Sequence, residues 1–414
     1  MGTRVMSDFS HDSLLKRDNG SENPLRPRRD IDFDFGLDQR VTNVGNVVSP
    51  VQGGRQQQTQ TDQVKKLAGL SIGFCGLFAE QLLSHPCIVL RRQCQVHHAG
   101  AWYHLTPISL IQTVINIQKS QGGLVLWKGL GSVYIVRGIS MVSETVISEI
   151  TTFPREVSRH SSLKKLGGHV LLKGVVFAVA TPFLAASLVE TVQSDIASER
   201  PGVLDVLFEG VTRIGMWGNL HSARQIQLWQ LALPTVIFRL SHYIVSSIAQ
   251  FTVSSAMHLE QQEIREQPGE NGREPSVYET YFPDLLATLT GGLLADIITF
   301  PLETVLHRLY VQGTRTIIDN TDTGLGVIPI NTRYEGFLDC FKCIVKEEGL
   351  QGLYKGFGAL ILQYAIHAAI LRLVKFMFEK LSEECDLRQQ QYKASQLAVK
   401  SRSQDLSYGE GSSK

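Results

Sequence analysis

The sequence lacks any block of basic residues large enough to bind a nucleic acid. Its 414 residues carry 40 Lys and Arg against 39 Asp and Glu, so the formal net charge is only +1. Nucleic-acid surfaces need clustered positive charge, and we therefore expect no nucleic-acid partner. Phosphate loops, nucleophile elbows and paired-carboxylate motifs are also missing. The sequence thus predicts neither an enzyme nor a bound cofactor.

Cysteine is scarce, and its spacing excludes a disulfide framework. Three of the six cysteines lie in long apolar stretches, where they are expected to be buried thiols. Cys340 and Cys343 have a spacing found in metal and redox sites, but no second pair accompanies them. The four histidines between residues 85 and 104 do not match a zinc pattern either. We therefore expect no metal site.

Uncharged runs of 18 residues, the usual length of a membrane span, are also few. Six long apolar stretches, most of them interrupted by a charged residue, nevertheless occupy the middle of the chain, at about residues 65–97, 131–150, 166–197, 228–255, 281–312 and 357–381. Taken singly, each suits a buried helix of a soluble protein as well as a membrane helix whose ionisable residues face an interior cavity.

The two ends of the chain are polar. Residues 1–63 hold eight Arg and Lys against nine Asp and Glu, with a Gln-rich run near residue 55. Such a composition predicts a disordered arm, and it matches neither a mitochondrial presequence nor a secretory signal. Residues 382–414 are also polar and of mixed charge, which predicts a C-terminal tail. The apolar domain therefore extends over residues 64–381.

Two eleven-residue segments inside that domain are copies of one pattern, namely Gln121–Gly131 (QGGLVLWKGLG) and Glu348–Gly358 (EGLQGLYKGFG). Self-similarity of this kind indicates tandem repeats. Prolines inside the first, third and fifth apolar stretches support this, since a kink there lets three helices converge at one end of a bundle; they are Pro86, Pro182 and Pro301. The pattern predicts three repeats, at about 64–150, 165–255 and 281–381, and argues against a soluble protein.

These motifs make the chain resemble the mitochondrial carrier family. The third repeat matches best, with Pro301-Leu-Glu303, Gln312-Gly313, Glu348-Gly349 and Tyr354-Lys355-Gly356. The first repeat keeps Pro86, Arg91 and Trp127-Lys128-Gly129, whereas the second keeps little beyond Pro182 and Gln193. The resemblance implies an all-α membrane protein, a carrier bundle of six transmembrane helices in three pseudo-repeats.

The runs at 85–95 and 301–323 are similar to a divergent outer-membrane branch of that family. This similarity implies a multi-pass protein of the mitochondrial outer membrane with its N-terminal arm in the cytosol. It also implies a role in the balance of fission and fusion, in cristae organisation and in membrane contacts. The partners implied are membrane proteins of the fusion and cristae-organising machinery, with lipid as a further candidate.

The resemblance also identifies positions for a gate, the ring of ion pairs that closes one end of a carrier's cavity. The family's three acid positions are Ile88, Leu184 and Glu303 here, and the three base positions are Arg91, Ser187 and Leu306. Four of the six charges are therefore missing. The two that remain, Arg91 and Glu303, are predicted to pair with each other. One pair cannot form a ring, which favours a scaffold over a working transporter.

Arginines in the even-numbered stretches support the alternative, a transporter of solutes or lipids. One lies in each, and together they would line a basic cavity that binds a carboxylate or an anionic headgroup: Arg137, Arg239 and Arg372. They could equally pair with interior acids or extend to a membrane interface. The sequence leaves this choice open.

Overall fold

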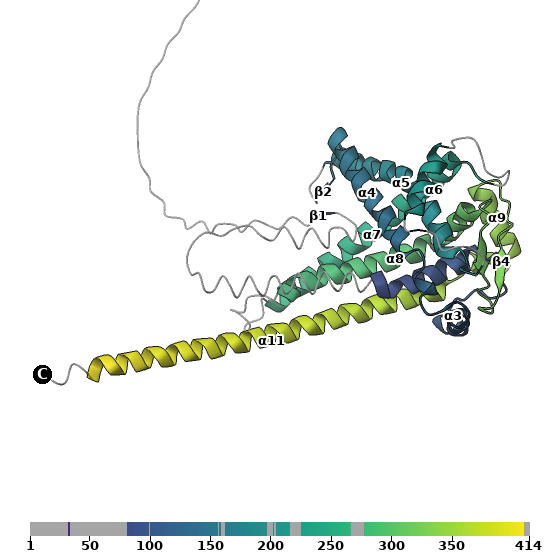
Figure 1. The fold of residues 1–414 in the computed structure, drawn as a ribbon. Helices are drawn as coiled ribbons and strands as arrows, with labels where there is room; N and C mark the ends of the chain where they lie inside the picture. Colours follow the sequence, from purple (N-terminus) through teal and green to yellow (C-terminus); the bar gives the residue numbers. More distant parts are fainter. Residues whose placement is uncertain are drawn as a thin grey trace, which may run out of the picture.

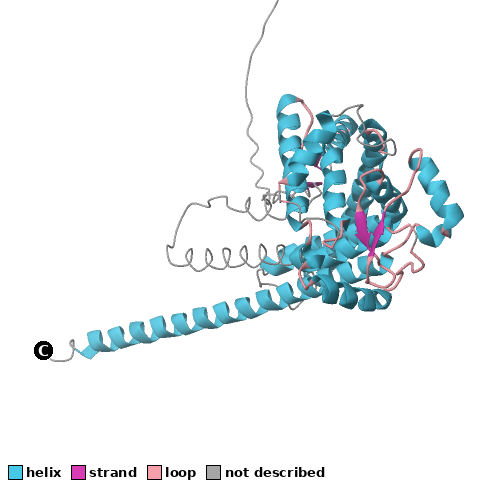
Figure 2. Cartoon of the chain, turned by 45° about the vertical axis from the view of Figure 1, so that its right-hand side comes forward, coloured by secondary structure: helices cyan, strands magenta, loops and turns pink. Residues whose placement is uncertain are grey.

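The computed structural model describes residues 32–33, 81–98, 100–155, 157–158, 162–196, 202, 204–215, 225–265 and 277–409. Within them the protein is a bundle of long helices with two short pairs of strands (Figures 1 and 2). The long helices are a helix over residues 81–96, α4 (Leu130–Ile150), α5 (Leu163–Val192), α7 (Leu228–Arg265), α8 (Val277–Val311) and α11 (Phe357–Gly409). The all-α membrane class is therefore confirmed.

Five of these helices contain segments long and apolar enough to cross a membrane: Val125–Ile150, Leu163–Val192, Leu228–Glu260, Phe282–Val311 and Phe357–Met377. Helix 81–96 corresponds to the first predicted stretch, whose first part lies outside the described residues. Large apolar side chains are exposed along the helices, among them Val142, Ile237 and Ile298. Such exposure is the pattern of helices that face lipid.

The three repeat prolines all lie inside helices, Pro86 in helix 81–96, Pro182 in α5 and Pro301 in α8. These are the first helices of the three repeats, as the sequence predicts. Pro234 and Pro283 also lie within helices, close to the first residues of α7 and α8. Proline is thus not confined to the middle of odd-numbered helices.

Short helices connect the two long helices of each repeat. They are α3 (Pro107–Gln121) with the 3-10 turn Val125–Trp127, then α6 (Asp205–Gly215), then α9 (Phe337–Glu347) with α10 (Gly349–Gly352). On α9, Cys340 and Ile344 face the bundle, which explains the buried thiol. Among the described residues no group of His, Cys, Asp or Glu could hold a metal ion.

A β-hairpin, which the sequence analysis did not predict, is inserted between α8 and α9. Its strands β3 (Ile317–Asp319) and β4 (Val327–Pro329) are antiparallel, with Ile318 opposite Ile328 (Figure 2, magenta). The insertion is visible in the spacing of the repeats, because the closing lysine follows its proline by 42 residues in the first repeat and by 54 in the third. A second strand pair joins β1 (Asp32–Phe33) to β2 (Val157–Ser158).

The predicted tail at 382–414 does not begin with a break in the structure. Helix α11 continues through it to Gly409 and extends far beyond the bundle (Figure 1). Glu, Gln, Lys, Arg and Ala dominate this segment, and no proline or glycine interrupts it before Gly409. These residues have high helix propensity, so the helix needs no apolar face to continue. The rest of the N-terminal arm lies outside the described residues.

Candidate functional site

The structure brings Arg91 and Glu303 together. Nη2 of Arg91, in helix 81–96, lies 3.2 Å from Oε1 of Glu303 in α8, and both side chains are largely buried. Gln95 donates a hydrogen bond of 3.0 Å to the other carboxylate oxygen, and its own oxygen lies 2.6 Å from Nδ1 of His307. The two gate charges that remain are therefore part of a hydrogen-bonded network that joins the first and third repeats.

Asp296, a residue that the sequence analysis missed, extends this network to two more helices. Its carboxylate lies 3.6 Å from Nη1 of Arg91 and 2.9 Å from Nε2 of His242 in α7. It also accepts a hydrogen bond of 2.9 Å from the hydroxyl of Tyr364 in α11. An acid in the middle of an apolar stretch is costly unless it is paired, and that rule could have identified it.

The positions that have lost their gate charges pack as ordinary bundle residues. Leu306 is 1% exposed and belongs to the largest hydrophobic core cluster. The hydroxyl of Ser187 lies 3.0 Å from that of Ser132 in α4. Both positions would bury an unpaired charge if only one partner of a pair were restored, which is costly in a helix bundle. The absence of gate charges at both positions therefore avoids a buried charge without a partner.

The three predicted cavity arginines lie in different surroundings. Arg137 on α4 and Arg239 on α7 are half-buried, whereas Arg372 is exposed near the end of the membrane-spanning part of α11. Arg239 interacts electrostatically with Arg92 and His307. The structure thus places Arg239 with the basic residues of helix 81–96, and the exposure of Arg372 favours contact with a membrane interface.

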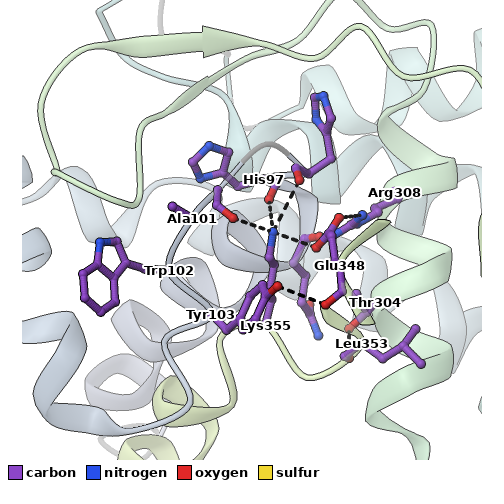
Figure 3. A network of polar contacts seen from close by, with 12 residues as sticks. His97, Ala101, Trp102, Tyr103, Thr304, Arg308, Glu348, Leu353 and Lys355 are labelled. Carbon is purple, nitrogen blue, oxygen red and sulfur yellow. Dashed lines mark hydrogen bonds and ion pairs between the residues drawn. The ribbon is translucent and has the colours of Figure 1, made fainter. Parts of the chain in front are cut away.

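The lysine of the LYKG segment binds the end of the first repeat helix (Figure 3). Lys355 donates hydrogen bonds of 3.0 Å to the carbonyl oxygen of His97 and 3.1 Å to that of Gly100, just after helix 81–96 ends. Its ammonium group also lies 2.7 Å from Glu348, which binds Arg308 through both oxygens. A cation at the carbonyl end of a helix is favoured by the helix dipole.

The lysine of the LWKG segment repeats this arrangement on the next repeat. Lys128 donates a 2.7 Å hydrogen bond to the carbonyl of Gln193, which caps the C-terminus of α5. Gln193 and His97 each lie eleven residues after a repeat proline, so they are equivalent positions. Lys128 therefore fastens the first repeat to the first helix of the second. Lys355 fastens the third repeat to the first helix of the first repeat. The corresponding segment of the second repeat lies outside the described residues.

Comparison with known proteins agrees with this architecture. The sequence profile of the mitochondrial carrier protein family matches residues 278–383. The mitochondrial outer membrane protein SLC25A46 of Gallus gallus is 48% identical over 321 residues, which are 77% of this chain and 78% of the relative. Its counterpart in Homo sapiens is 47% identical over 330 residues, 80% of this chain and 78% of the relative. The chain belongs to the mitochondrial carrier family, in the branch of solute carrier family 25 member 46.

Membership of the mitochondrial carrier family explains why the chain contains related repeats. The family profile matches the third repeat, where proline, glutamate, glutamine and the closing lysine are all present. A further relative, solute carrier family 25 member 46-B of Xenopus laevis, is 47% identical over 337 residues, 81% of each chain. The region shared with this branch therefore extends well beyond the third repeat.

In this carrier-family bundle, reversing the charges of Arg91 and Glu303 tests the remaining pair. Each single change, Arg91→Glu or Glu303→Arg, leaves two like charges together and is expected to cost about 3–5 kcal/mol. The double variant should recover part of this loss, about 0.5–3 kcal/mol, but not all of it, because Glu at position 91 would face Asp296. Thermal unfolding in detergent measures all three. Strictly additive losses would contradict the pair.

The carrier-family domain should also lose stability in acid, because buried groups outside the membrane-spanning helices resist protonation, among them His104 and Asp319. Burial lowers the pKa of His104. Burial acts to raise the pKa of Asp319, but Lys128 and hydrogen-bond donors outweigh it and lower that pKa. As the pH falls, these two groups therefore bind protons in the unfolded chain before they do so in the folded protein. The histidine does so below about pH 6.5 and the aspartate below about pH 3.9.

The unfolding temperature of this carrier-family domain should accordingly fall as the pH falls from about 7 to 4. His104 has a positive φ of 48°, which asparagine tolerates, so His104→Asn is a suitable control. That variant should lose only the share of His104 in the slope between about pH 6.5 and 5, because His97 and His98, whose pKa values burial also lowers, keep theirs. An unfolding temperature that rises on acidification would contradict the assignment.

Proposed function

We propose that this chain is a scaffold of the mitochondrial outer membrane that acts in mitochondrial dynamics through protein partners. Its proposed roles are the balance of fission and fusion, cristae organisation and membrane contacts. The observation that carries the proposal is the loss of four gate charges out of six in a bundle that keeps the carrier architecture. A chain that cannot close and reopen a ring of ion pairs has lost the means by which repeats of a carrier move against each other.

Contacts between α7 and α8 support a rigid bundle. Polar side chains pair along the whole length of these antiparallel helices, in the order Thr235–Tyr310, His242–Asp296, Gln250–Thr288 and Ser254–Asp284, at 2.6, 2.9, 2.8 and 2.8 Å. Gly291 lets the two backbones approach closely, since a Cβ there would lie 2.9 Å from the carbonyl of Ser246. Hydrogen bonds between helices are maintained where no water competes for them. Sliding of α7 along α8 would break all four pairs.

The outer-membrane location rests on the names of the relatives, which are mitochondrial outer membrane proteins in chicken and human. A protease added to intact mitochondria should remove the arm at 1–63 if that arm lies in the cytosol, and leave the membrane domain. Full protection of the arm would contradict this placement. Proximity labelling from the same arm should then recover membrane proteins of the fusion and cristae-organising machinery.

A second candidate function is the transport of a solute or lipid. It is favoured by Arg239, which forms no ion pair within the described part of the chain and lies near Arg92. The two functions differ in their response to Arg239→Ala. A scaffold carrying this change should restore mitochondrial shape in cells that lack the protein, as wild type does. Loss of rescue together with loss of saturable uptake in reconstituted vesicles would establish transport instead.

A further inference from the structure

The β3–β4 hairpin lies where the first helices of all three repeats end. It follows directly after α8, and the backbone N–H of Ser194, just beyond α5, donates a 2.8 Å hydrogen bond to the carbonyl of Ile317. Gln193 and Ile318 form an isolated antiparallel bridge. Ile318 is fully buried in the largest core cluster, together with Leu188 and Leu309. The hairpin is therefore part of the core at this end of the bundle.

A buried carboxylate fastens the hairpin to the first repeat. Asp319 is 1% exposed, and it accepts hydrogen bonds of 2.9 Å from Nε2 of Gln93 and 2.7 Å from Nε2 of Gln121. The ammonium group of Lys128 lies 3.0 Å away and binds the end of α5 at the same time. One side chain of the hairpin thus connects helix 81–96, α3 and the LWKG segment.

The turn of the hairpin makes further contacts with the loop that follows helix 81–96. The Thr321 hydroxyl lies 2.6 Å from Nδ1 of His97, and its carbonyl lies 2.9 Å from Nε2 of His104. Asp322 accepts hydrogen bonds of 2.9 and 3.1 Å from the backbone N–H groups of Ala101 and Trp102.

Gly324 lies so close to α3 that a Cβ would be 2.5 Å from the carbonyl of Thr113, and its φ of +69° also favours glycine. The hairpin is therefore fixed at its base, its first strand and its turn.

We propose that this hairpin is a latch that holds one end of the bundle permanently shut. It takes the place of the four missing gate charges with contacts that do not need to break and re-form. A gate made of exposed ion pairs can open, because water replaces each lost partner. The latch buries its charges and hydrogen bonds, so opening it would leave Asp319 and Lys128 unpaired in the interior. This inference rests on the proposed scaffold function and explains how it is built.

A native cysteine reports on the latch. Cys94, in helix 81–96, is 2% exposed and lies within hydrogen-bonding reach of Thr321. Cys87 belongs to the same helix, is equally buried and lies two turns further from the hairpin. Two proteins are prepared, one with Cys94 and one with Cys87 as its only cysteine. Both are reconstituted into lipid nanodiscs and reacted with a membrane-impermeant maleimide. The Asp319→Ala variant of each opens the latch, and Glu335→Gln, an exposed carboxylate, is the matched control.

The latch predicts that Asp319→Ala accelerates labelling of Cys94 on the order of a hundredfold and leaves Cys87 protected, with Glu335→Gln unchanged. Equal acceleration at both cysteines would overturn it, because the hairpin would then stabilise the whole bundle rather than close one end. Unchanged labelling of Cys94 in the double variant Asp319→Ala with Asp322→Ala would also overturn it. Transport by the wild-type protein would overturn the latch and the scaffold function together, because an end held permanently shut excludes alternating access. Failure of the Cys94 test alone would leave the scaffold function standing, since protection of Cys94 is measured without any solute.

Discussion

Replacing Glu348 by alanine is expected to lower the free energy of unfolding by about 3–5 kcal/mol, the cost of breaking a buried ion pair by removing one partner. The carboxylate of Glu348 binds two cations at once, Arg308 through both of its oxygens and Lys355 at 2.7 Å. The side chains of the two cations are only 2% and 1% exposed. Alanine would therefore leave two positive charges buried together without an anion (Figure 3).

The adjacent residue supplies the control for this experiment. Glu347 is exposed, so Glu347→Ala should change the free energy of unfolding by less than about 0.5 kcal/mol. Both variants can be compared in detergent by thermal unfolding at one pH and salt concentration. Similar losses of unfolding free energy for the two changes, or a loss below about 1 kcal/mol for Glu348→Ala, would contradict this account. The ion pairs of Glu348 with Arg308 and Lys355 would then not hold the third repeat to the first.

Substitution of Gly358 by alanine is the second change with a large expected effect. A Cβ at this position would lie 2.3 Å from the carbonyl oxygen of Thr106 and 2.8 Å from the nitrogen of Pro107. Both atoms belong to backbone, which cannot rotate away as a side chain can. The N–H of Gly358 also donates a 2.9 Å hydrogen bond to the carbonyl of His104, which fixes the separation. We expect a loss of about 3 kcal/mol or more.

A glycine with free space provides the comparison. Gly138 lies inside α4, and a Cβ there would meet no atom within 4 Å. Gly138→Ala should therefore stabilise the protein by about 0.5–1 kcal/mol through its higher helix propensity. Opposite signs for the two glycine variants in the same unfolding assay are the expected result. A neutral Gly358→Ala would mean that α11 and the loop before α3 do not touch as described.

The repeats and the remaining charge pair could be predicted because both depend on short, local patterns. Pro86 and Pro301 lie inside apolar runs, and Lys128 and Lys355 lie in two copies of one segment. A proline, a charge or a glycine in such a run limits what the backbone can do there. The family's spacing rule then matched Arg91 with Glu303 across 212 residues. No local pattern could have matched them without that rule.

The hairpin could not be predicted, because its strands are short and its contacts are distant in sequence. Three-residue strands such as Ile317–Asp319 give no periodic signal that separates them from a loop. Asp319 looks like one more loop acid until Gln93 and Lys128, about two hundred residues earlier, are placed beside it. The longer gap between proline and closing lysine in the third repeat was the available sign of an insertion.

The arginines of the even helices show a second limit of sequence reasoning. The presence of one arginine in each even-numbered stretch suggested one shared basic site, but Arg372 is exposed and Arg239 lies near Arg92 instead. Helical periodicity gives the face of a residue only to within about one turn, and depth in the bundle depends on tilt and packing. Composition likewise separated the polar tail from the domain but could not show that α11 continues into it.

Distances between the three repeats, at the end of the bundle closed by the hairpin, test the central claim most directly. The claim is that this carrier bundle no longer alternates between two conformations. Spin labels placed in pairs at Lys119 on α3, Thr212 on α6 and Lys342 on α9 occupy exposed sites on the short helices. Alternating access would rock these helices apart and together. We predict one distance population for each pair in lipid nanodiscs, with or without added carboxylates, nucleotides or phospholipids. Two populations that exchange, or a shift on addition of a solute, would contradict a bundle held shut.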